Sequence, residues 1–361
     1  MDEAMALARQ SAGRTSPNPA VGAVLVRDGR VVGRGTHTWA GVKHAEILAL
    51  DEAGDRARGA TLYVTLEPCS HTGRTGPCAD ALAAAGVSRV VAAMADPNPA
   101  VSGEGFRRLR QAGVEVETVS EYEAESAALN EAFLHFMRTS RPLVTLKAAL
   151  TLDGKIAAPE DNSGWITSER ARAHVQQIRH LSDAILTGIG TVLADDCRLT
   201  DRTGLGRARP LLRIVLDSTL RIPLTSSLVE SAHGDLAVVT TSASSPGRRK
   251  ALQDRGVEVH VFDTPGGRVS LPKIVELLAS RQYRSLMIEA GGQVNWAALE
   301  ARVVDKIFFY YAPKILGGLD SLPVAAGPGR KRRIDAIRMA NVKLHPIPPD
   351  EFAVEAWVVN G

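Results

Sequence analysis

The sequence predicts an α/β protein made of two domains. Its 361 residues exceed what a single hydrophobic core usually organises. Short apolar segments typical of strands alternate with segments of helical periodicity, a pattern that indicates sheets covered by helices. The alternation stops near Arg141-Pro142 and then restarts with a strand. We therefore expect one domain over residues 1–142 and a second over residues 143–361.

The first half alternates helices and strands in a regular order. Asp28-Gly29 separates two apolar runs and is a strong hairpin signal. Gly13 and Gly54 each follow a helical segment, as glycines at helix ends do. The expected helices cover residues 2–12, 44–53, 79–85, 105–111 and 121–138, and the expected strands cover 21–27, 31–35, 60–66 and 89–93.

The second half repeats this alternation over a longer stretch and contains no internal sequence repeat. Its expected strands cover residues 143–149, 184–187, 211–216, 236–240, 257–262, 285–289, 306–311 and 352–359. Its expected helices cover residues 169–181, 246–255, 271–280 and 294–301.

Composition argues against several classes of protein. Hydrophobic residues make up 45% and charged residues 23%, as in ordinary soluble proteins, and the net charge is only +3. We therefore expect no nucleic-acid partner, and the lack of any run of about 20 apolar residues argues against a membrane span. Three cysteines and the acidic start Met1-Asp2-Glu3, which is unlike a signal peptide, predict a cytoplasmic protein without a disulfide framework.

One group of residues has the pattern of a catalytic zinc site: His44-Ala45-Glu46, then Pro68-Cys69, then Cys78. An imidazole and two thiolates supply three ligands and leave the fourth tetrahedral position to water, as catalysis requires. Glu46 is then available to move protons between that water and a departing amine. This is the H-x-E…P-C signature of zinc-dependent base deaminases. A structural zinc site needs a fourth protein ligand, and the remaining cysteine, Cys197, lies in the other half.

The two cysteines of this group are nine positions apart, whereas base deaminases usually have C-x-x-C. The intervening segment carries His71 and Arg74. The arginine fork suits a phosphorylated substrate, although a solvated loop also explains these residues.

Two strand–glycine–helix segments in the second half are compatible with a dinucleotide cofactor. They cover residues 184–191, with Gly188 and Gly190, and residues 288–296, with Gly291 and Gly292. Glycines at such turns let a phosphate approach backbone N–H groups at a helix start. Plain tight turns remain an alternative, and the pattern alone does not choose between NADPH and NADH.

These motifs resemble those of the bifunctional riboflavin-biosynthesis deaminase/reductase family. The matching stretches are PNPAVGAVLV, HAEILAL, YVTLEPCSHTGRTGPC and ADPNPAVSGEG, then TLKAALTLDGKIA, WITSERAR, GIGTVLADD and FFYYAPKILGG. They extend over nearly the whole chain, and the long cysteine spacing is this family's own pattern. The resemblance implies a cytidine-deaminase-like three-layer domain followed by a dihydrofolate-reductase-like domain.

For the first domain, the resemblance implies zinc on His44, Cys69 and Cys78, with Glu46 as the catalytic proton shuttle. It also implies a pyrimidine and ribose-phosphate site, lined by Asn18, His37, His71, Arg74, Asp96 and Asn98.

For the second domain, the resemblance implies NADPH-dependent reduction of the ribosyl side chain, with Asp195 as a catalytic residue. The implied cofactor contacts are Ala149, Trp165, Thr167, Thr191, Asp195, Ser218, Gly291, Gly292, Gln293, Val294, Asn295, Trp296 and Ala297. The implied substrate contacts are Lys147, Ser163, Arg179, Leu199, Arg202 and Glu289. Cys197 departs from the family pattern, because a proline usually follows the paired aspartates.

The expected function is therefore two consecutive steps of riboflavin biosynthesis. Hydrolytic deamination of 2,5-diamino-6-ribosylamino-4(3H)-pyrimidinone 5′-phosphate precedes NADPH-dependent reduction to 5-amino-6-ribitylamino-uracil 5′-phosphate, and we expect a homo-oligomer. A nucleic-acid base deaminase with an appended binding domain is the main alternative. It calls for stacking aromatic residues, which make up only 4% of this chain. A non-catalytic zinc module is a further alternative, but it leaves Glu46 without a role.

Overall fold

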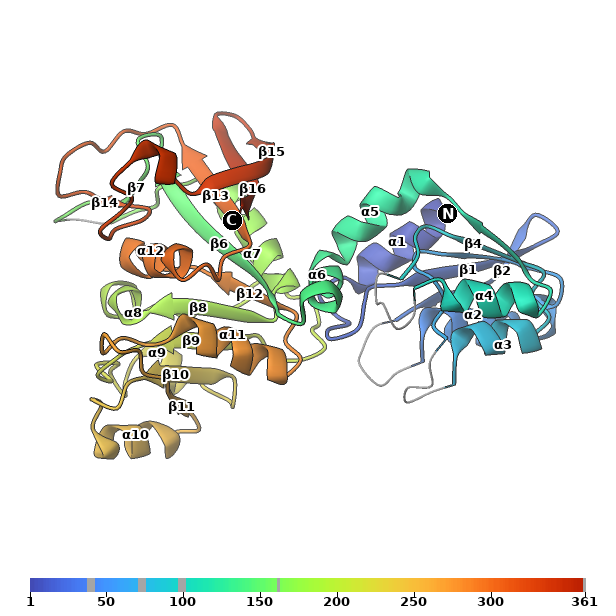
Figure 1. Ribbon diagram of the computed structural model, residues 1–361, viewed down its shortest axis with the longest axis horizontal. Coiled ribbons are helices and arrows are strands. Elements are labelled where there is room, and N and C mark those ends of the chain that lie inside the picture. The colour runs from blue at the N-terminus through green and yellow to red at the C-terminus, as the bar shows by residue number, and fades with distance from the viewer. Residues whose placement is uncertain (38–42, 71–75, 97–101, 161–162, 360–361) are drawn as a thin grey trace. The chain divides into compact units, whose positions relative to one another are not determined.

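The computed structural model describes residues 1–37, 43–70, 76–96, 102–160 and 163–359. It divides the chain into two compact units, each with its own sheet (Figure 1). Unit 1 comprises Met1–Ser140 together with Gly206–Arg209, and unit 2 comprises Arg141–Leu205 together with Pro210–Gly361. The predicted α/β fold class is confirmed.

Unit 1 is built on a five-stranded sheet with the order β2-β1-β3-β4-β5. The hairpin of the first two strands is antiparallel and turns at Asp28 and Gly29, both with positive φ, while β3, β4 and β5 are parallel to one another. These strands are β1 (Gly22–Arg27), β2 (Arg30–Thr36), β3 (Thr61–Val64), β4 (Arg89–Ala92) and β5 (Glu115–Thr118).

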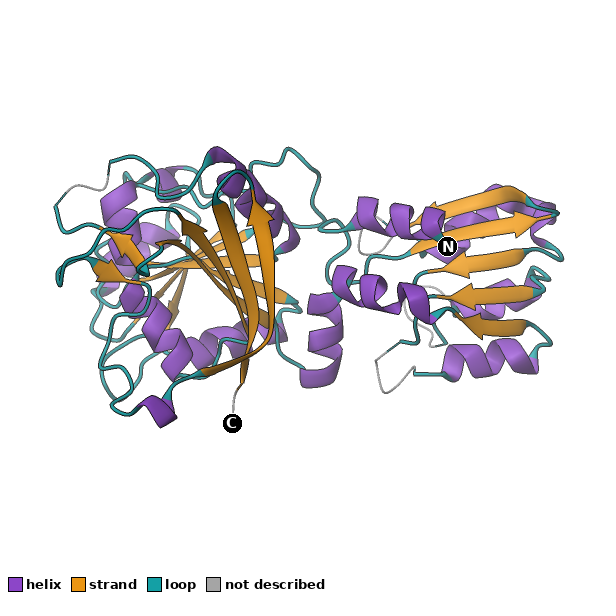
Figure 2. Ribbon diagram, turned by 90° about the horizontal axis from the view of Figure 1, so that it is seen from above, coloured by secondary structure: helices purple, strands orange, loops and turns teal. Residues whose placement is uncertain are grey.

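Helices cover both faces of this sheet and complete a three-layer arrangement (Figures 1 and 2). In Figure 1, α1 and α5 lie on one side of the strands, and α2, α3 and α4 on the other. The helices are α1 (Asp2–Ser11), α2 (Ala45–Ala53), α3 (Cys78–Ala84), α4 (Glu104–Gln111), α5 (Glu123–Leu129) and α6 (Glu131–Thr139).

Unit 2 is built on a nine-stranded sheet with the order β11-β10-β9-β8-β12-β6-β13-β16-β15. The strands from β11 to β13 run parallel, and β16 and β15 add an antiparallel edge. They are β6 (Leu143–Thr151), β8 (Ala184–Gly188), β9 (Leu212–Leu216), β10 (Leu236–Thr240), β11 (Glu258–Val261), β12 (Ser285–Ile288), β13 (Lys306–Ala312), β15 (Arg338–Ile347) and β16 (Glu351–Val359).

The helices of unit 2 connect its parallel strands and lie on both sides of the sheet (Figure 2). They are α7 (Glu169–Leu181), α8 (Ile189–Asp195), α9 (Ser227–Glu230), α10 (Pro246–Gln253), α11 (Leu271–Ser280) and α12 (Gly292–Glu300). A separate two-stranded sheet joins β7 (Lys155–Ala157) to β14 (Leu322–Pro323).

Two differences from the sequence-based elements have clear physical causes. The single helix expected over residues 121–138 is two helices, because Asn130 leaves helical geometry between them. Its buried side chain accepts a hydrogen bond from Ala20 N at 2.7 Å and donates one to Ala20 O at 3.0 Å. Strand β15 was not predicted from the sequence. It lies at the edge of the sheet with Val342 and Leu344 exposed to solvent, so its apolar residues do not mark a buried face.

Within the described part of the chain, none of the helices has the length and apolar character needed to cross a membrane.

Helix α2 lies unusually close to strand β2. A Cβ on Gly35 would overlap the carbonyl oxygen of Ala45, and one on Gly33 would overlap the carbonyl oxygen of Ala49. Alanines at the helix surface and glycines in the strand therefore set this spacing. Because His44 is the N-cap of α2, the same packing fixes the position of the helix start.

We predict that Gly35→Ala destabilises unit 1 by about 1–3 kcal/mol, because the added methyl forces α2 away from the sheet. Hydrogen exchange of the α2 amides in the full chain measures this as local opening.

The matched control is Gly247→Ala at the start of α10, where a Cβ would meet only Ser245 Oγ at 3.7 Å. That variant should be neutral or slightly stabilising. Equal protection of α2 in the Gly35→Ala variant and the unmodified protein would contradict the close-packing argument.

Candidate functional site

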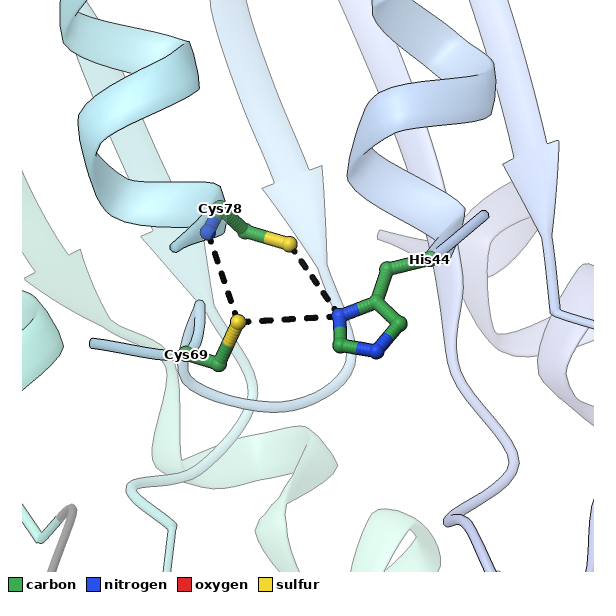
Figure 3. A group of neighbouring side chains, drawn as sticks. All are labelled: His44, Cys69 and Cys78. Carbon is green, nitrogen blue, oxygen red and sulfur yellow. Dashed lines mark hydrogen bonds between the residues drawn. The ribbon is translucent and has the colours of Figure 1, made fainter. Parts of the chain in front are cut away.

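Three side chains from separate elements meet at one point of unit 1 (Figure 3). His44 precedes the first residue of α2, Cys69 lies in the loop after β3, and Cys78 begins α3. The Nδ1 atom of His44 lies 3.2 Å from Cys78 Sγ and 3.6 Å from Cys69 Sγ. The backbone N–H of Cys78 also donates to Cys69 Sγ at 3.3 Å. The structure therefore brings together the three ligands predicted from the sequence.

This cluster fits a zinc ion. All three ligand atoms lie within 4.8 Å of one another. Zn–N and Zn–S bonds of about 2.0 and 2.3 Å in a tetrahedron separate neighbouring ligand atoms by roughly 3.5–3.8 Å. Among the described residues, these three form the only His/Cys/Asp/Glu group that could hold a metal ion. A hydrogen bond from the Cys78 thiol lowers the pKa of Cys69, so a thiolate is favoured here before metal binds.

Glu46 lies one residue into α2, beside this cluster, and its side chain is only 4% exposed. Burial raises the pKa of its carboxyl to about 7, and the neighbouring Cys69 thiolate adds to the shift. A carboxyl whose pKa is near neutrality can both accept and donate a proton. Its place beside the cluster suits the predicted proton shuttle.

His37 lies next to His44, and Asn18 contacts His37. The amide nitrogen of Asn18 is 3.1 Å from His37 Nε2, and the rings of His37 and His44 meet edge to face with centroids 5.8 Å apart. Burial lowers the pKa of His37, which favours the neutral imidazole. If Asn18 donates to Nε2, Nδ1 carries the proton and donates to Lys43 O at 3.2 Å.

Glu67 is a residue of this site that the sequence reading missed. Its buried carboxylate accepts backbone N–H bonds from Asp96 at 3.0 Å, Gly103 at 3.0 Å and Phe106 at 3.2 Å. Glu67 N also donates to Met94 O at 3.0 Å. One residue thus ties Asp96 and the rest of the segment after β4 to the loop that carries Cys69. The available signal was an acidic residue directly before Pro68-Cys69.

Three residues implied to contact the deaminase substrate, His71, Arg74 and Asn98, lie outside the described residues.

In unit 2, Glu289 gathers two cations predicted to contact the reductase substrate. Lys147 Nζ donates to Glu289 Oε1 at 2.9 Å, and Arg179 Nη2 donates to Oε2 at 2.8 Å. Burial alone would raise the pKa of Glu289, but the positive charges of Lys147 and Arg179 outweigh it and lower that pKa to about 2. The three groups come from β6, α7 and the residue directly after β12, so only the folded sheet brings them together.

The two glycine segments predicted for a cofactor also lie side by side. Strands β8 and β12 are parallel neighbours, and each leads into a helix, α8 or α12. A Cβ on Gly188 would approach Val294 Cγ2 to 2.8 Å, so α12 packs directly on the end of β8. Clefts beyond the carboxyl ends of parallel strands commonly bind nucleotides, where helix starts offer free N–H groups.

The remaining residues predicted to contact cofactor or substrate lie on several elements of unit 2. Asp195 ends α8, and partial burial raises the pKa of its carboxyl. Trp165 is 68% exposed and stacks against Arg172, whose guanidinium carbon is 4.7 Å from the indole centroid. Burial and the nearby Asp195 raise the pKa of Cys197 to about 11, so this thiol is protonated at neutral pH. The other predicted contacts lie as follows: Ala149 in β6, Ser163 and Thr167 before α7, Thr191 in α8, Leu199 and Arg202 after α8, Ser218 after β9, and Gly291–Ala297 at the start of α12.

We predict about one zinc ion per chain and its loss in both Cys69→Ser and Cys78→Ser, because each change removes a thiolate from the cluster. Metal analysis of the purified full chain measures this. Cys197→Ser is the matched control and should keep its zinc, since Cys197 belongs to unit 2. Full zinc content in either of the first two variants would refute the ligand set.

Comparison with known proteins extends over both units. Residues 1–94 match the family model "Cytidine and deoxycytidylate deaminase zinc-binding region", and residues 142–350 match "RibD C-terminal domain". The riboflavin biosynthesis protein RibD of Bacillus amyloliquefaciens is 40% identical, over 97% of this chain and 93% of its own. That of Escherichia coli is 41% identical, over 97% of this chain and 96% of its own.

Solved structures agree with this relationship. RibD of Acinetobacter baumannii superposes with a TM-score of 0.87 at 36% identity, over 99% of this chain and 98% of its own. A diaminohydroxyphosphoribosylaminopyrimidine deaminase/5-amino-6-(5-phosphoribosylamino)uracil reductase from Thermotoga maritima superposes with a TM-score of 0.82 at 35% identity, over 99% and 97%. The chain therefore belongs to the RibD family, the bifunctional deaminase/reductases of riboflavin biosynthesis, with a zinc-binding deaminase domain and a reductase domain of the type that uses NADPH.

Proposed function

We propose that this chain deaminates diaminohydroxyphosphoribosylaminopyrimidine and then reduces 5-amino-6-(5-phosphoribosylamino)uracil, the two activities named for its Thermotoga maritima relative. The deaminase activity is assigned to residues 1–142 and the reductase activity to residues 143–361. One observation carries the first assignment. His44, Cys69 and Cys78 form a cluster that can hold a metal, and the buried carboxyl of Glu46 lies beside it without being one of the three ligands. The paired cations on Glu289 support the second.

In the deaminase reaction, His44, Cys69 and Cys78 would hold zinc, and zinc when bound makes water acidic enough to act as a nucleophile near neutral pH. Glu46 would accept one proton of the attacking water and deliver it to the pyrimidine ring, then take the second proton of the same oxygen and transfer it to the departing amino group, which leaves as ammonia. Its raised pKa suits both directions of transfer. Asn18 and His37 orient the ring beside His44, and Asp96 contributes from the segment after β4.

In the reductase reaction, NADPH when bound supplies the hydride to the ribosyl carbon. The starts of α8 and α12 bind the cofactor, with Asp195 at the end of α8 orienting it or assisting proton delivery. Lys147 and Arg179 contact the polar substrate. Glu289 holds both cations at fixed positions, so little reorganisation is needed when the substrate binds.

We also propose that the protein acts in the cytoplasm as a homo-oligomer. The cysteines Cys69, Cys78 and Cys197 are free, and zinc binding by the first two requires reduced thiols. Val342 and Leu344 are exposed on the edge strand β15, an arrangement that favours association with another copy.

We predict that Glu46→Gln lowers ammonia release by about 10²–10⁴-fold, because the amide keeps the shape of the side chain but cannot shuttle protons. Zinc content and NADPH oxidation with pre-deaminated substrate should be unchanged. The matched control is Glu52→Gln on the same helix, where Glu52 accepts a hydrogen bond from the backbone of Arg34. Near-normal ammonia release from Glu46→Gln would remove Glu46 from the mechanism.

We predict that Asp195→Ala cripples NADPH oxidation with pre-deaminated substrate while sparing deamination. The neighbouring Asp196→Ala is the matched control. The Asp196 carboxylate accepts hydrogen bonds from the Ser227 hydroxyl at 2.6 Å and from the Ser227 backbone N–H at 2.8 Å, so it already has a structural partner. That control should retain turnover. Normal turnover of Asp195→Ala would reduce Asp195 to a structural role, and loss of ammonia release in this variant would overturn the two-site assignment.

A further inference from the structure

A short loop in unit 2, residues 200–203, is held against helix α7 by side-chain hydrogen bonds. Arg179 Nη1 donates to Thr200 O at 3.0 Å. His180 Nδ1 lies 2.8 Å from Asp201 Oδ2. The backbone N–H of Arg202 donates to Gln176 Oε1 at 3.0 Å. Three side chains of one helix thus hold three successive residues of the loop.

The pair formed by His180 and Asp201 is the buried centre of this attachment. Their side chains are only 5% and 8% exposed. The second carboxylate oxygen, Asp201 Oδ1, accepts the Thr203 hydroxyl at 2.8 Å and the Thr203 backbone N–H at 2.9 Å. One carboxylate therefore binds the helix with one oxygen and closes the loop with the other.

The residue directly before the loop has an uncommon conformation. Leu199 has φ +51, in the left-handed region that branched side chains rarely occupy, and its side chain is 3% exposed within the core. Such a conformation costs free energy and persists only where the surroundings enforce it. The Leu199 side chain is held by its burial in the core, and the chain that follows is held by the contact of Asp201 with His180, so the backbone keeps this conformation.

The loop is also connected to the proposed reductase site. The same Arg179 that holds Thr200 also donates from Nε and Nη2 to Glu289, which in turn binds Lys147. Arg202 stands in the loop with its backbone fixed and its side chain exposed. An exposed guanidinium on a rigid backbone is well suited to bind a phosphate group.

We infer that Asp201 and His180 are positioning residues, whose buried pair holds the 200–203 loop so that Arg202 meets the phosphate of the reductase substrate. This inference rests on the proposed function, in which Arg202 contacts that substrate. The pair itself touches neither substrate nor cofactor. It acts by keeping the loop in the binding conformation before the substrate arrives.

The expected effect follows from the population of that conformation. When only a fraction of molecules is competent to bind, the apparent dissociation constant rises by the inverse of that fraction. If Asp201→Ala leaves about a tenth of the loops in place, KM for the phosphorylated substrate rises about tenfold. Because phosphate is held equally in the ground and transition states, kcat should change little.

The test uses the full chain with pre-deaminated substrate and measures NADPH oxidation. Asp201→Ala and His180→Ala should each raise KM for the phosphorylated substrate, while KM for NADPH and the rate of ammonia release stay unchanged. Asp201→Asn should recover much of the loss, because its amide oxygen can accept from Thr203 while its amide nitrogen stays within hydrogen-bonding distance of His180 Nδ1. With dephosphorylated substrate, Asp201→Ala should match the unmodified protein.

Glu258→Gln is the matched control, because Glu258 forms a His–carboxylate pair with His260 at 3.0 Å on β11. It should leave KM unchanged. The decisive comparison is Asp201→Ala combined with Arg202→Ala. If the pair acts through Arg202, the double variant should have the same KM as Arg202→Ala alone.

Each outcome bears on a different statement. An unchanged KM in Asp201→Ala, or effects of Asp201→Ala and Arg202→Ala that multiply, would overturn the positioning role. An unchanged KM in Arg202→Ala would instead remove Arg202 from the proposed substrate site. If Asp201→Ala also raises KM for NADPH or lowers kcat, the pair is a general structural support of unit 2 and the inference fails.

Discussion

The close packing of α2 on β2 is the constraint on which the deaminase site depends. Gly33 and Gly35 leave room for the helix backbone, and that spacing places His44 and Glu46 where the loop after β3 delivers Cys69. Side chains at these two positions would force α2 away from the sheet, and His44 and Glu46 would move with it. A metal site tolerates little displacement of its ligands, so the predicted zinc site depends on having glycine at both positions.

Both units use a buried carboxylate to organise other groups rather than to react. Glu67 accepts from three backbone N–H groups, in the segment after β4 and at the start of α4. Glu289 gathers Lys147 and Arg179, and Asp201 closes a loop onto His180. A charge in the interior is costly unless it is fully paired, so each of these carboxylates strongly favours one arrangement of its partners.

The cluster of His44, Cys69 and Cys78 could be predicted from the sequence, because zinc chemistry restricts both residue type and spacing. The roles of Lys147, Arg179 and Glu289 could not be worked out from spacing, since they lie on separate elements and required the family resemblance. Glu67 was missed because an acidic residue before a cysteine has no distinctive pattern. Strand β15 was missed for a related reason: an edge strand in contact with solvent lacks the alternation of a half-buried strand.

The sequence by itself determined the α/β class, most of the elements, which residues form the His–Cys–Cys cluster beside Glu46, and the relationship to a two-activity family. These depend on local periodicity, on turn chemistry and on residue types that few functions share. Only the tertiary structure decided that Glu289 pairs two cations, that the β8 and β12 turns are neighbours, and that Asp201 fastens its loop to α7. Those contacts join residues far apart in the chain, and strand order, which local sequence does not encode, determines which of them meet.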